Sequence, residues 1–310
     1  MPLDAATRYC AVLGHPIRHS ASPAMQNAGI AALGLDWRYL AFEVHPDDLR
    51  PVIEGAKAMR FIGLNLMVPH KLLAADMVDA KDESAKTWGA VNTIRFEGRD
   101  AKGKWRPLRE FTEAMPREVR SLGFNTDADA ITRSLTEDLG VKLKGATVLL
   151  LGAGGAGRVA ALKLASEGVS ELFLVNRTES KAEALALEIG RRFPKIKAEV
   201  GYPKKANLAL DLLLNATSLG LKPGDESPLD MGKFALRRAA AVYDMIYRPA
   251  ETALLKAARA AGCRTANGVG MLLYQGARAL EIWTGKPAPV ETMREALLKN
   301  IYGNSPGRDF

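Results

Sequence analysis

Cysteine is scarce in this chain, and the two that occur lie far apart. Cys10 and Cys263 match no spacing of a zinc site or of a redox pair among the 310 residues. We therefore expect neither a metal centre nor a disulfide framework. Two isolated thiols are typical of a reducing compartment, so the sequence predicts a cytoplasmic protein.

Long apolar runs are also missing. The longest apolar stretches have the length of core strands, far below the ~20 residues that cross a bilayer. The opening Met-Pro-Leu-Asp shows no basic segment followed by an apolar one, so no secretory signal is expected. We expect no membrane partner.

Charge of one sign dominates no stretch of the chain. Lysine and arginine number 43 against 35 aspartate and glutamate residues, a net charge of +8, but the basic residues are scattered. Glutamates interrupt the most basic region, between residues 102 and 120. A solvated basic surface explains this pattern better than a polyanion site, so no nucleic-acid partner is expected. A modest positive field would still attract an anionic substrate and a phosphorylated cofactor.

The first third of the chain alternates apolar segments with helical stretches. Strands are expected at 9–13, 37–42 and 61–66, and helices at 23–33 and 46–59. This alternation predicts an α/β domain with a mainly parallel sheet. A strand at 91–96 is followed by a polar stretch, 97–121, which is long for a connection inside a compact domain. The sequence leaves its role open.

The second half repeats a strand–helix pattern around a glycine-rich run. Strands are expected at 147–151, 171–175, 210–214 and 241–245, and helices at 127–139, 158–167, 268–283 and 290–301. The repetition is typical of a doubly wound, Rossmann-like dinucleotide-binding fold. We predict a Rossmann domain over residues 123–267. An N-terminal α/β substrate-binding domain over residues 1–122 is expected to be completed by the helices within 268–310, so the fold class is α/β with two domains.

The glycine-rich run comprises Gly152, Ala153, Gly154, Gly155, Ala156 and Gly157. A strand, a G-x-G-x-x-G loop and a helix N-terminus together bring backbone N–H groups against a pyrophosphate. A side chain at Gly152 or Gly154 would block the phosphates or the tight turn, and Gly157 lets helix and strand pack closely. The motif is common, so it is weak evidence when taken alone.

The residues after the next strand bear on the choice of nicotinamide cofactor. An NAD site usually has Asp or Glu there, whereas this chain has Asn176, Arg177 and Thr178, with Lys181 one helical turn further on. Two cations and a hydroxyl would attract a ribose 2′-phosphate that a carboxylate would repel. We therefore predict NADP as the cofactor. The alternative is a helix N-cap at Thr178 beside ordinary surface cations.

Several polar residues stand at expected strand ends and turns, where solvent exposure alone does not explain them. They are Ser20, Ser22, Asn65, Lys71, Asn92, Asp127, Tyr247 and Gln275. Ligands of parallel α/β sheets bind beyond the carboxyl ends of the strands. Ser20 and Lys71 are expected at such ends, so they can converge although they are distant in sequence.

Each of these residues also has a structural interpretation. Lys71 alone is typical of a surface lysine at a helix start. Ser22 and Asp127 fit helix N-caps, and Asn65 and Asn92 could satisfy backbone groups of loops. Their joint occurrence in this order favours a catalytic and substrate-binding site.

The ordered set of motifs resembles the shikimate dehydrogenase family over about residues 9–285. The resemblance is carried by Ser20-Ala21-Ser22-Pro23, Pro69-His70-Lys71, Ala90-Val91-Asn92-Thr93, Asn125-Thr126-Asp127, Asn176-Arg177-Thr178 and Asn215-Ala216-Thr217-Ser218. By this resemblance, the protein interconverts shikimate and 3-dehydroshikimate with NADP.

The resemblance also implies roles for individual residues. Lys71 and Asp127 match the family's catalytic pair. The implied substrate-binding residues are Ser20, Ser22, Met67, Asn92, Tyr247 and Gln275. The implied cofactor-binding residues are the glycine-rich run from Gly152 to Gly157, with Asn176, Arg177, Thr178, Lys181, Thr217, Ser218, Gly268 and Met271. No metal is implied.

The chemistry of alcohol oxidation gives the lysine a specific task. Oxidising a secondary alcohol removes a hydride from carbon, which nicotinamide accepts, and a proton from oxygen. A group within hydrogen-bond reach must take that proton, and Lys71 is the candidate. The Asp127 carboxylate is expected to hold the ammonium group and to accept a hydrogen bond from a substrate hydroxyl.

The sequence departs from the family pattern next to this lysine. The usual Asn-Val-Thr-x-Pro-Phe-Lys appears as Asn65-Leu66-Met67-Val68-Pro69-His70-Lys71, so Met67 replaces a threonine that normally bonds a ring hydroxyl. Losing such a hydrogen bond costs about 0.5–1.5 kcal/mol. Gln26, Ala130 and Ala253 likewise replace a usual histidine, glycine and proline. Quinate, an aminated shikimate analogue or another cyclic hydroxy acid is therefore the alternative substrate.

Two other classes of function fit the sequence less well. A nucleotide-binding sensor without catalysis would need neither Lys71 nor Asp127, and both are present. A nucleic-acid-binding protein would need a clustered basic and aromatic surface. The sequence does not give the oligomeric state and is compatible with a homodimer.

Overall fold

The computed structural model describes residues 3–205, 207–222 and 224–303. The chain divides into two compact units. The first unit contains residues 3–127 and Leu273–Gly303, and the second contains Ala128–Leu272. Both changes of unit lie in helices, α5 (Asp127–Glu137) and α9 (Val269–Thr284). Residues 304–310, which the predicted substrate domain included, lie outside the described ranges.

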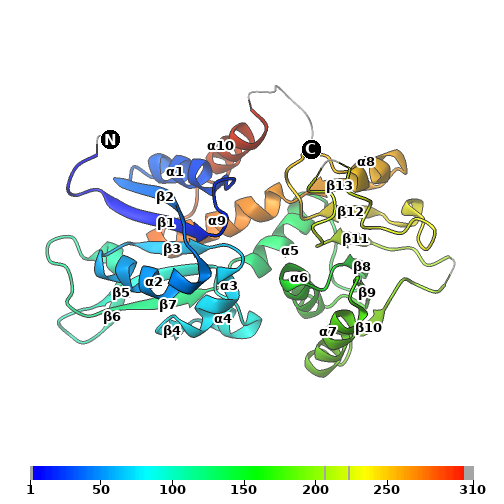
Figure 1. Ribbon diagram of the computed structural model, residues 1–310, viewed down its shortest axis with the longest axis horizontal. Helices are drawn as coiled ribbons and strands as arrows, with labels where there is room; N and C mark the ends of the chain where they lie inside the picture. The colour runs from blue at the N-terminus through cyan, green and yellow to red at the C-terminus, as the bar shows by residue number, and fades with distance from the viewer. Residues whose placement is uncertain (1–2, 206, 223, 304–310) are drawn as a thin grey trace. The chain divides into compact units, whose positions relative to one another are not determined.

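The first unit contains a seven-stranded sheet in the order β2-β1-β3-β5-β7-β4, with β6 paired to β5 (Figure 1). The strands are β1 (Arg8–Gly14), β2 (Trp37–Glu43), β3 (Gly63–Leu66), β4 (Ala80–Lys81), β5 (Thr93–Arg99), β6 (Trp105–Pro107) and β7 (Val119–Phe124). Strand β1 is parallel to β2 and β3, and β4 is parallel to β7. Strand β5 runs antiparallel to β3, β6 and β7, so parallel pairing describes only part of this sheet.

The polar stretch 97–121 largely belongs to this antiparallel part. Strand β5 continues to Arg99, β6 returns beside it, and β7 begins at Val119. Glu97 and Arg120 are opposite each other, and the Arg120 Nη2 atom lies 2.7 Å from the Glu97 Oε2 atom. Paired charges on neighbouring strands stabilise the sheet but remove the apolar alternation by which strands are recognised in a sequence.

The position of β7 in the first sheet bears on where, along the sequence, the first unit ends. Residues 123 and 124 pair with β5 as the end of β7, and the first unit continues to Asp127, whereas the predicted Rossmann domain began at residue 123. At the other end, the structure assigns residues 268–272 to the second unit.

The helices of the first unit are partly built from the end of the chain. They are α1 (Ser22–Ala32), α2 (Leu49–Ala58), α3 (His70–Leu73), α4 (Glu83–Trp88), the later part of α9 and α10 (Val290–Tyr302), with 3₁₀ turns η1 (Pro46–Asp48), η2 (Ala74–Asp76) and η3 (Leu108–Glu110). Helix α1 packs against α10 (Figure 1). The buried Trp283 of α9 donates its indole N–H to the carbonyl oxygen of Ile94 in the sheet, at 2.9 Å.

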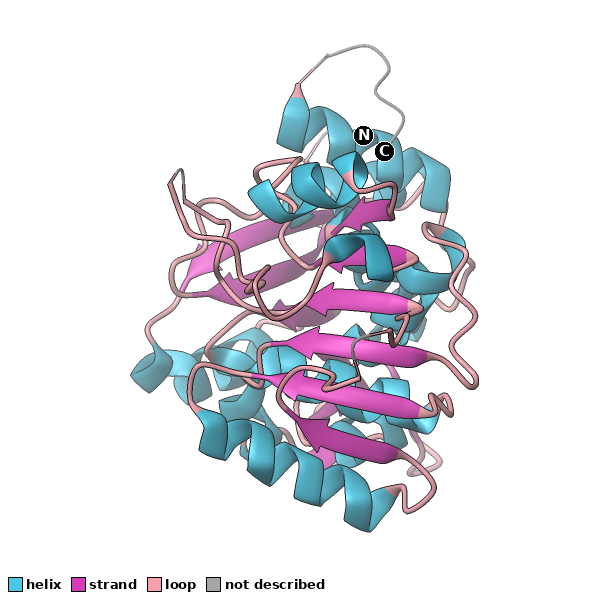
Figure 2. Cartoon of the chain, turned by 90° about the vertical axis from the view of Figure 1, so that its right-hand side faces the viewer, coloured by secondary structure: helices cyan, strands magenta, loops and turns pink. Residues whose placement is uncertain are grey.

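The second unit contains a six-stranded sheet in the order β10-β9-β8-β11-β12-β13, in which every pairing is parallel (Figure 2). Its strands are β8 (Thr147–Leu151), β9 (Glu171–Val175), β10 (Lys197–Val200), β11 (Leu212–Asn215), β12 (Ala241–Asp244) and β13 (Arg264–Asn267). Its other elements are α6 (Gly155–Ser166), α7 (Glu179–Arg192), α8 (Ala253–Ala260) and the 3₁₀ turn η4 (Leu236–Arg238). The strand order is that of a doubly wound dinucleotide-binding fold, as predicted.

The two edge strands of this sheet were not predicted from the sequence. Strand β10 has the sequence Lys-Ala-Glu-Val and β13 has Arg-Thr-Ala-Asn. An edge strand is covered on fewer sides than a central strand, so it can carry polar residues that hide its pattern.

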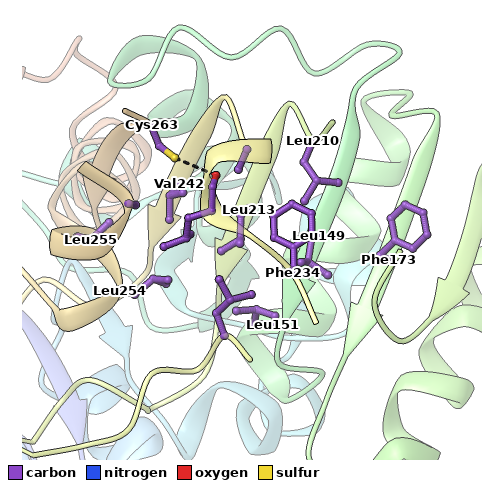
Figure 3. Packing of buried hydrophobic residues seen from close by; sticks show 14 residues of the cluster. Leu149, Leu151, Phe173, Leu210, Leu213, Phe234, Val242, Leu254, Leu255 and Cys263 are labelled. Carbon is purple, nitrogen blue, oxygen red and sulfur yellow. Dashed lines mark hydrogen bonds between the residues drawn. The ribbon is translucent and has the colours of Figure 1, made fainter. Parts of the chain in front are cut away.

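Buried apolar side chains fill one face of the second sheet (Figure 3). Leu149 and Leu151 alternate along β8 onto this face, and Leu254 and Leu255 of α8 belong to the same cluster. The thiol of Cys263 lies in this cluster, 3.2 Å from the carbonyl oxygen of Leu236.

Among the described residues, no helix combines the length and the hydropathy that crossing a bilayer requires.

Candidate active site

Lys71 and Asp127 form a direct ion pair in the first unit. Lys71 lies in α3, just after β3, and Asp127 is the first residue of α5, just after β7. The Lys71 Nζ atom lies 2.7 Å from the Asp127 Oδ2 atom, and the two side chains are 28% and 12% exposed. The structure therefore brings together the two residues on which the predicted chemistry depends. At this distance the contact is a charge-assisted hydrogen bond.

Two buried asparagines fix the backbone that leads to Asp127. The Asn92 Oδ1 atom accepts from the N–H of Thr126 at 2.8 Å, and the Asn92 Nδ2 atom donates to the Thr126 hydroxyl at 3.0 Å. The Asn125 Oδ1 atom accepts from the N–H of Asp127 at 3.1 Å. Asn92 is only 1% exposed. Its contacts agree with the alternative prediction, in which Asn92 bonds to backbone groups of a loop. Its contact with a substrate remains a prediction.

Asn65 is also committed within the protein. Its Oδ1 atom accepts from the Tyr39 hydroxyl at 2.8 Å, and its Nδ2 atom donates to the Thr93 hydroxyl at 3.0 Å. Asn65 and Asn92 thus belong to one buried polar network at the ends of β3 and β5. Such networks hold a unique geometry when all their members are satisfied.

Helix α3 is a single turn, too short to be stable by itself, so long-range contacts must hold it. His70 is its buried residue, at 0% exposure, and the His70 Nε2–H group donates to the carbonyl oxygen of Val44 at 2.9 Å. The N–H of Val91 donates to the carbonyl oxygen of Lys71 at 2.9 Å. These two bonds position the lysine backbone. No role of His70 was predicted from the sequence, because a histidine beside a lysine gives no sign of burial.

The serine segment lies between β1 and α1. The Ser20 hydroxyl oxygen accepts from the N–H of Ser22 at 3.4 Å. Ser22 is the first residue of α1 and Ala21 holds the N-cap position, so the interpretation of Ser22 as an N-cap is wrong. Met67 follows β3, and its N–H donates to the carbonyl oxygen of Leu13 at 2.9 Å. Gln275, half-buried in α9, belongs to the same unit.

The glycine-rich run adopts the predicted strand–loop–helix geometry in the second unit. Gly152 has φ +105°, a left-handed conformation that suits glycine. A Cβ atom at Gly157 would lie 2.0 Å from the Gly152 carbonyl oxygen, so close packing excludes any side chain there. At Gly154 and Gly155, by contrast, an added Cβ would meet nothing within 4 Å. Internal packing therefore does not require glycine at these two positions, which leaves room for an approaching ligand.

The predicted 2′-phosphate residues surround the start of α7. The Asn176 Oδ1 atom accepts from the N–H of Ala153 at 2.9 Å, and the Asn176 Nδ2 atom donates to the Thr178 carbonyl oxygen at 2.8 Å. Arg177, Thr178 and Lys181 are exposed. Thr178 holds the N-cap position of α7, but its side chain makes no capping hydrogen bond. Asn176 thus ties the glycine loop to the turn that presents both cations.

The remaining predicted residues also lie in the second unit. Thr217 and the exposed Ser218 follow β11, and Tyr247 follows β12. Gly268 directly precedes α9, and Met271 lies in its first turn. Burial raises the pKa of the Tyr247 hydroxyl, so it is a neutral donor near neutral pH. Within the described ranges, no three His, Cys, Asp or Glu side chains are grouped to hold a metal ion.

Comparison with known proteins identifies the family. Models described as shikimate dehydrogenase substrate binding domain, shikimate / quinate 5-dehydrogenase and shikimate 5′-dehydrogenase C-terminal domain match residues 12–94, 134–217 and 268–298. A curated relative from Methanopyrus kandleri, named shikimate dehydrogenase (NADP+), is 38% identical over 303 residues, which cover 96% of this chain and 98% of that protein. The chain belongs to the shikimate dehydrogenase family. The resemblance seen in the sequence is confirmed.

Solved structures of the family share the fold of the whole chain. A crystal structure of a shikimate dehydrogenase in complex with NADP+ matches with a TM-score of 0.81 at 35% identity, covering 97% of this chain and 98% of that one. The ligand-free 5-ketofructose reductase of Gluconobacter sp. strain CHM43 matches with a TM-score of 0.79 at 33% identity, covering 96% and 100%. The predicted fold class is confirmed, and proteins named for a different substrate share it.

The burial of His70 gives the first prediction, which concerns stability. Burial lowers the pKa of His70, the Val44 carbonyl opposes this, and the nearby His15 and His45 lower the pKa further. The unfolded chain therefore binds a proton at His70 more readily than the folded protein does. Stability should fall as the pH drops below about 6.5, by at most about 1.4 kcal/mol per pH unit from this group.

We expect His70→Phe to reduce the loss of melting temperature between pH 7.5 and pH 5.5. Differential scanning fluorimetry at both pH values measures this loss. His19→Phe is the matched control, because His19 is exposed. Equal pH dependence in His70→Phe and the wild type would contradict the assignment.

Proposed function

We propose that this member of the family is an NADP-dependent oxidoreductase that interconverts shikimate and 3-dehydroshikimate. The observation that carries the proposal is the 2.7 Å bond between the Lys71 ammonium and the Asp127 carboxylate. The relatives described above, named for shikimate and NADP+, support the choice of substrate and cofactor. A nucleotide-binding sensor would have no use for such a pair.

In the proposed reaction the residues of the first unit manage the proton. When bound, NADP+ supplies the hydride acceptor. In the oxidation direction the substrate hydroxyl would give its proton to the Lys71 Nζ atom in its neutral amine form, which becomes the ammonium group bonded to Asp127. In the reduction direction this ammonium group would return the proton to the carbonyl oxygen of the ketone. Lys71 has further donor positions besides the one bonded to Asp127. The other oxygen of Asp127 accepts no hydrogen bond from the described residues, so a substrate hydroxyl can bond to it.

The substrate would be held by polar side chains around this pair. Ser20 and Ser22 are assigned to bind its carboxylate, because two hydroxyl donors on one short segment suit two carboxylate oxygens. The Ser20 oxygen accepts from the N–H of Ser22, which leaves its proton free to donate. We assign the ring hydroxyls to Asn92 and Gln275 of the first unit, whereas Met67 would offer the ring only an apolar contact. Tyr247 of the second unit is a further predicted substrate contact.

The cofactor would be held by the second unit. Gly154 and Gly155 leave open space where backbone N–H groups can approach a pyrophosphate. Arg177, Thr178 and Lys181 are exposed at the start of α7 and suit a 2′-phosphate. The further cofactor contacts in this proposal are Ala153, Ala156, Asn176, Thr217, Ser218, Gly268 and Met271.

An alternative substrate rests on Met67. A methionine beside Asn65 and Lys71 offers no O–H donor, so a ligand with a different hydroxyl pattern, quinate for example, competes with shikimate in this proposal. The 5-ketofructose reductase shows by its name that the fold also serves a sugar-derived ketone.

We place the enzyme in the cytoplasm on the ground that both of its cysteines are free, buried thiols. A homodimer remains a working hypothesis.

The second prediction tests the catalytic pair. Lys71→Ala should lower turnover about 10²- to 10⁴-fold, because the proton loses its acceptor, with little change in cofactor affinity. Turnover is followed by the absorbance of NADPH with shikimate and NADP+. Lys86→Ala is the matched control, since Lys86 is an exposed lysine of the first unit, paired with Glu83. Near-normal turnover of Lys71→Ala would refute the role of the lysine.

A panel of substrates that includes shikimate, quinate and 5-ketofructose, assayed with the wild-type enzyme, identifies the preferred substrate.

The third prediction concerns the cofactor. Replacing Arg177 by Ser should raise the Michaelis constant for NADP+ about tenfold or more and leave that for NAD+ nearly unchanged, because only NADP+ has a 2′-phosphate. Lys144→Ser, at an exposed lysine of the same unit, is the control. A wild-type enzyme that prefers NAD+ would defeat the assignment.

A further inference from the structure

Asp244 is a buried carboxylate outside the site residues described above. It ends β12 and is 0% exposed. Its Oδ1 atom accepts from Asn215 Nδ2 at 3.0 Å and from the N–H of Ile246 at 3.1 Å, and its Oδ2 atom accepts from the Thr252 hydroxyl at 2.7 Å. Among the described residues it has no ion pair. Neutral donors alone therefore satisfy a buried carboxylate, an arrangement that proteins use rarely.

The carboxylate sets the direction of the hydrogen bonds in the turn after β11. An ionised carboxylate can only accept, so Asn215 must turn its NH₂ group toward Asp244. The Asn215 carbonyl then faces the other way, where it accepts from the Thr217 N–H at 3.0 Å and from the Thr217 hydroxyl at 2.8 Å. The Thr217 oxygen in turn accepts from the N–H of Leu219 at 3.1 Å.

The consequence for Thr217 is chemical. Its single hydroxyl proton is committed to Asn215, and one of its two lone pairs is committed to Leu219. Toward a ligand, the hydroxyl can therefore act only as an acceptor. A group at position 244 that donates a hydrogen bond toward Asn215 would remove this constraint, because the Asn215 amide could then turn its oxygen toward position 244.

A second branch from Asp244 holds the segment that contains Tyr247. The N–H of Ile246 and the hydroxyl of Thr252 both donate to the carboxylate, on either side of Tyr247 in the sequence. Thr252 also caps α8, because its oxygen accepts from the N–H of Leu255 at 3.3 Å. The Thr252 hydroxyl group thus both donates and accepts a hydrogen bond, and the acceptor of its proton is the Asp244 carboxylate.

We propose that Asp244 is a positioning residue that orders two segments of the second unit through its hydrogen bonds. It fixes the turn 215–219 so that Thr217 presents an acceptor to a donor group of the cofactor, and it holds the segment 246–252 with Tyr247. This inference rests on the proposed function, because Thr217 is assigned to the cofactor there. Burial raises the pKa of Asp244, and the bonds from Thr252, Ile246 and Asn215 lower it.

The test measures NADPH binding by fluorescence titration, which needs no turnover, together with kcat and melting temperature. Asp244→Asn should weaken NADPH binding about tenfold, because the new NH₂ group replaces an acceptor oxygen to which Thr252, or Asn215 and Ile246, now donate. Asn215→Asp should weaken binding as well, since two acceptors then face each other. Thr136→Val is the control, because it removes an exposed threonine hydroxyl of the same unit that donates to the helix backbone.

The pair Thr252→Val and Thr252→Ser separates positioning from mere stability. Thr252→Val removes the donor to Asp244 and should weaken NADPH binding, whereas Thr252→Ser keeps the hydroxyl and should restore it. This pair decides the question if Asp244→Asn does not fold.

Folded Asp244→Asn and Thr252→Val that bind NADPH within twofold of the wild type, whatever their melting temperatures, would overturn the inference. If the wild-type protein itself binds no NADPH, the proposed function fails, and the role of Asp244 fails with it. If the wild type binds NADPH and the variants do not, the inference holds even where the identity of the alcohol substrate is revised.

Discussion

The hydrogen bond between the Lys71 ammonium and the Asp127 carboxylate is the interaction on which the site depends. It joins residues that are 56 positions apart in the sequence. Strand β3 leads to Lys71 and β7 leads to Asp127, and β5 lies between these strands in the sheet. Both charges are largely removed from solvent, so the loss of either partner would leave the other poorly compensated. The order of the strands in the sheet therefore places the two residues of the proposed catalytic pair close together.

Buried polar side chains hold loops in place within each unit. In the first unit, Asn92 bonds the backbone just before Asp127, and His70 anchors the single helical turn that carries Lys71. In the second unit, Asp244 and Asn215 do the same for the turn after β11. Polar groups of this kind cost free energy unless each finds a partner, so they specify one arrangement of the loops more strictly than apolar packing does.

Much of this architecture could be predicted from the sequence, because its signals are local. Apolar strands such as 147–151 and the glycine-rich loop after them follow from short-range rules, and the structure confirms both. The family resemblance pairs Lys71 with Asp127 from the sequence alone. Structural features that depend on contacts between residues far apart in the sequence could not be predicted in this way. The charges of β5 and β7 hid the antiparallel part of the first sheet, because Glu97 is stabilised there by Arg120, which is far away in the sequence.

The same reason explains what was missed in the site. Nothing near His70 in the sequence shows that its partner is the carbonyl of Val44. Asn92 was predicted as a substrate contact, with bonds to loop backbone groups as the alternative. That its partner is Thr126 appears only when β5 and the start of α5 are placed together. Side-chain roles that arise from tertiary contacts need the fold itself.

A double-mutant cycle on turnover tests the central claim most directly. The variants are Lys71→Ala, Asp127→Ala and the double variant, with kcat/KM for shikimate and NADP+ measured under identical conditions. If the ammonium and the carboxylate act as one unit, the double variant should be little slower than the slower single variant, so the effects are strongly non-additive. Effects that simply multiply would contradict the account, because they would mean that Lys71 and Asp127 contribute independently.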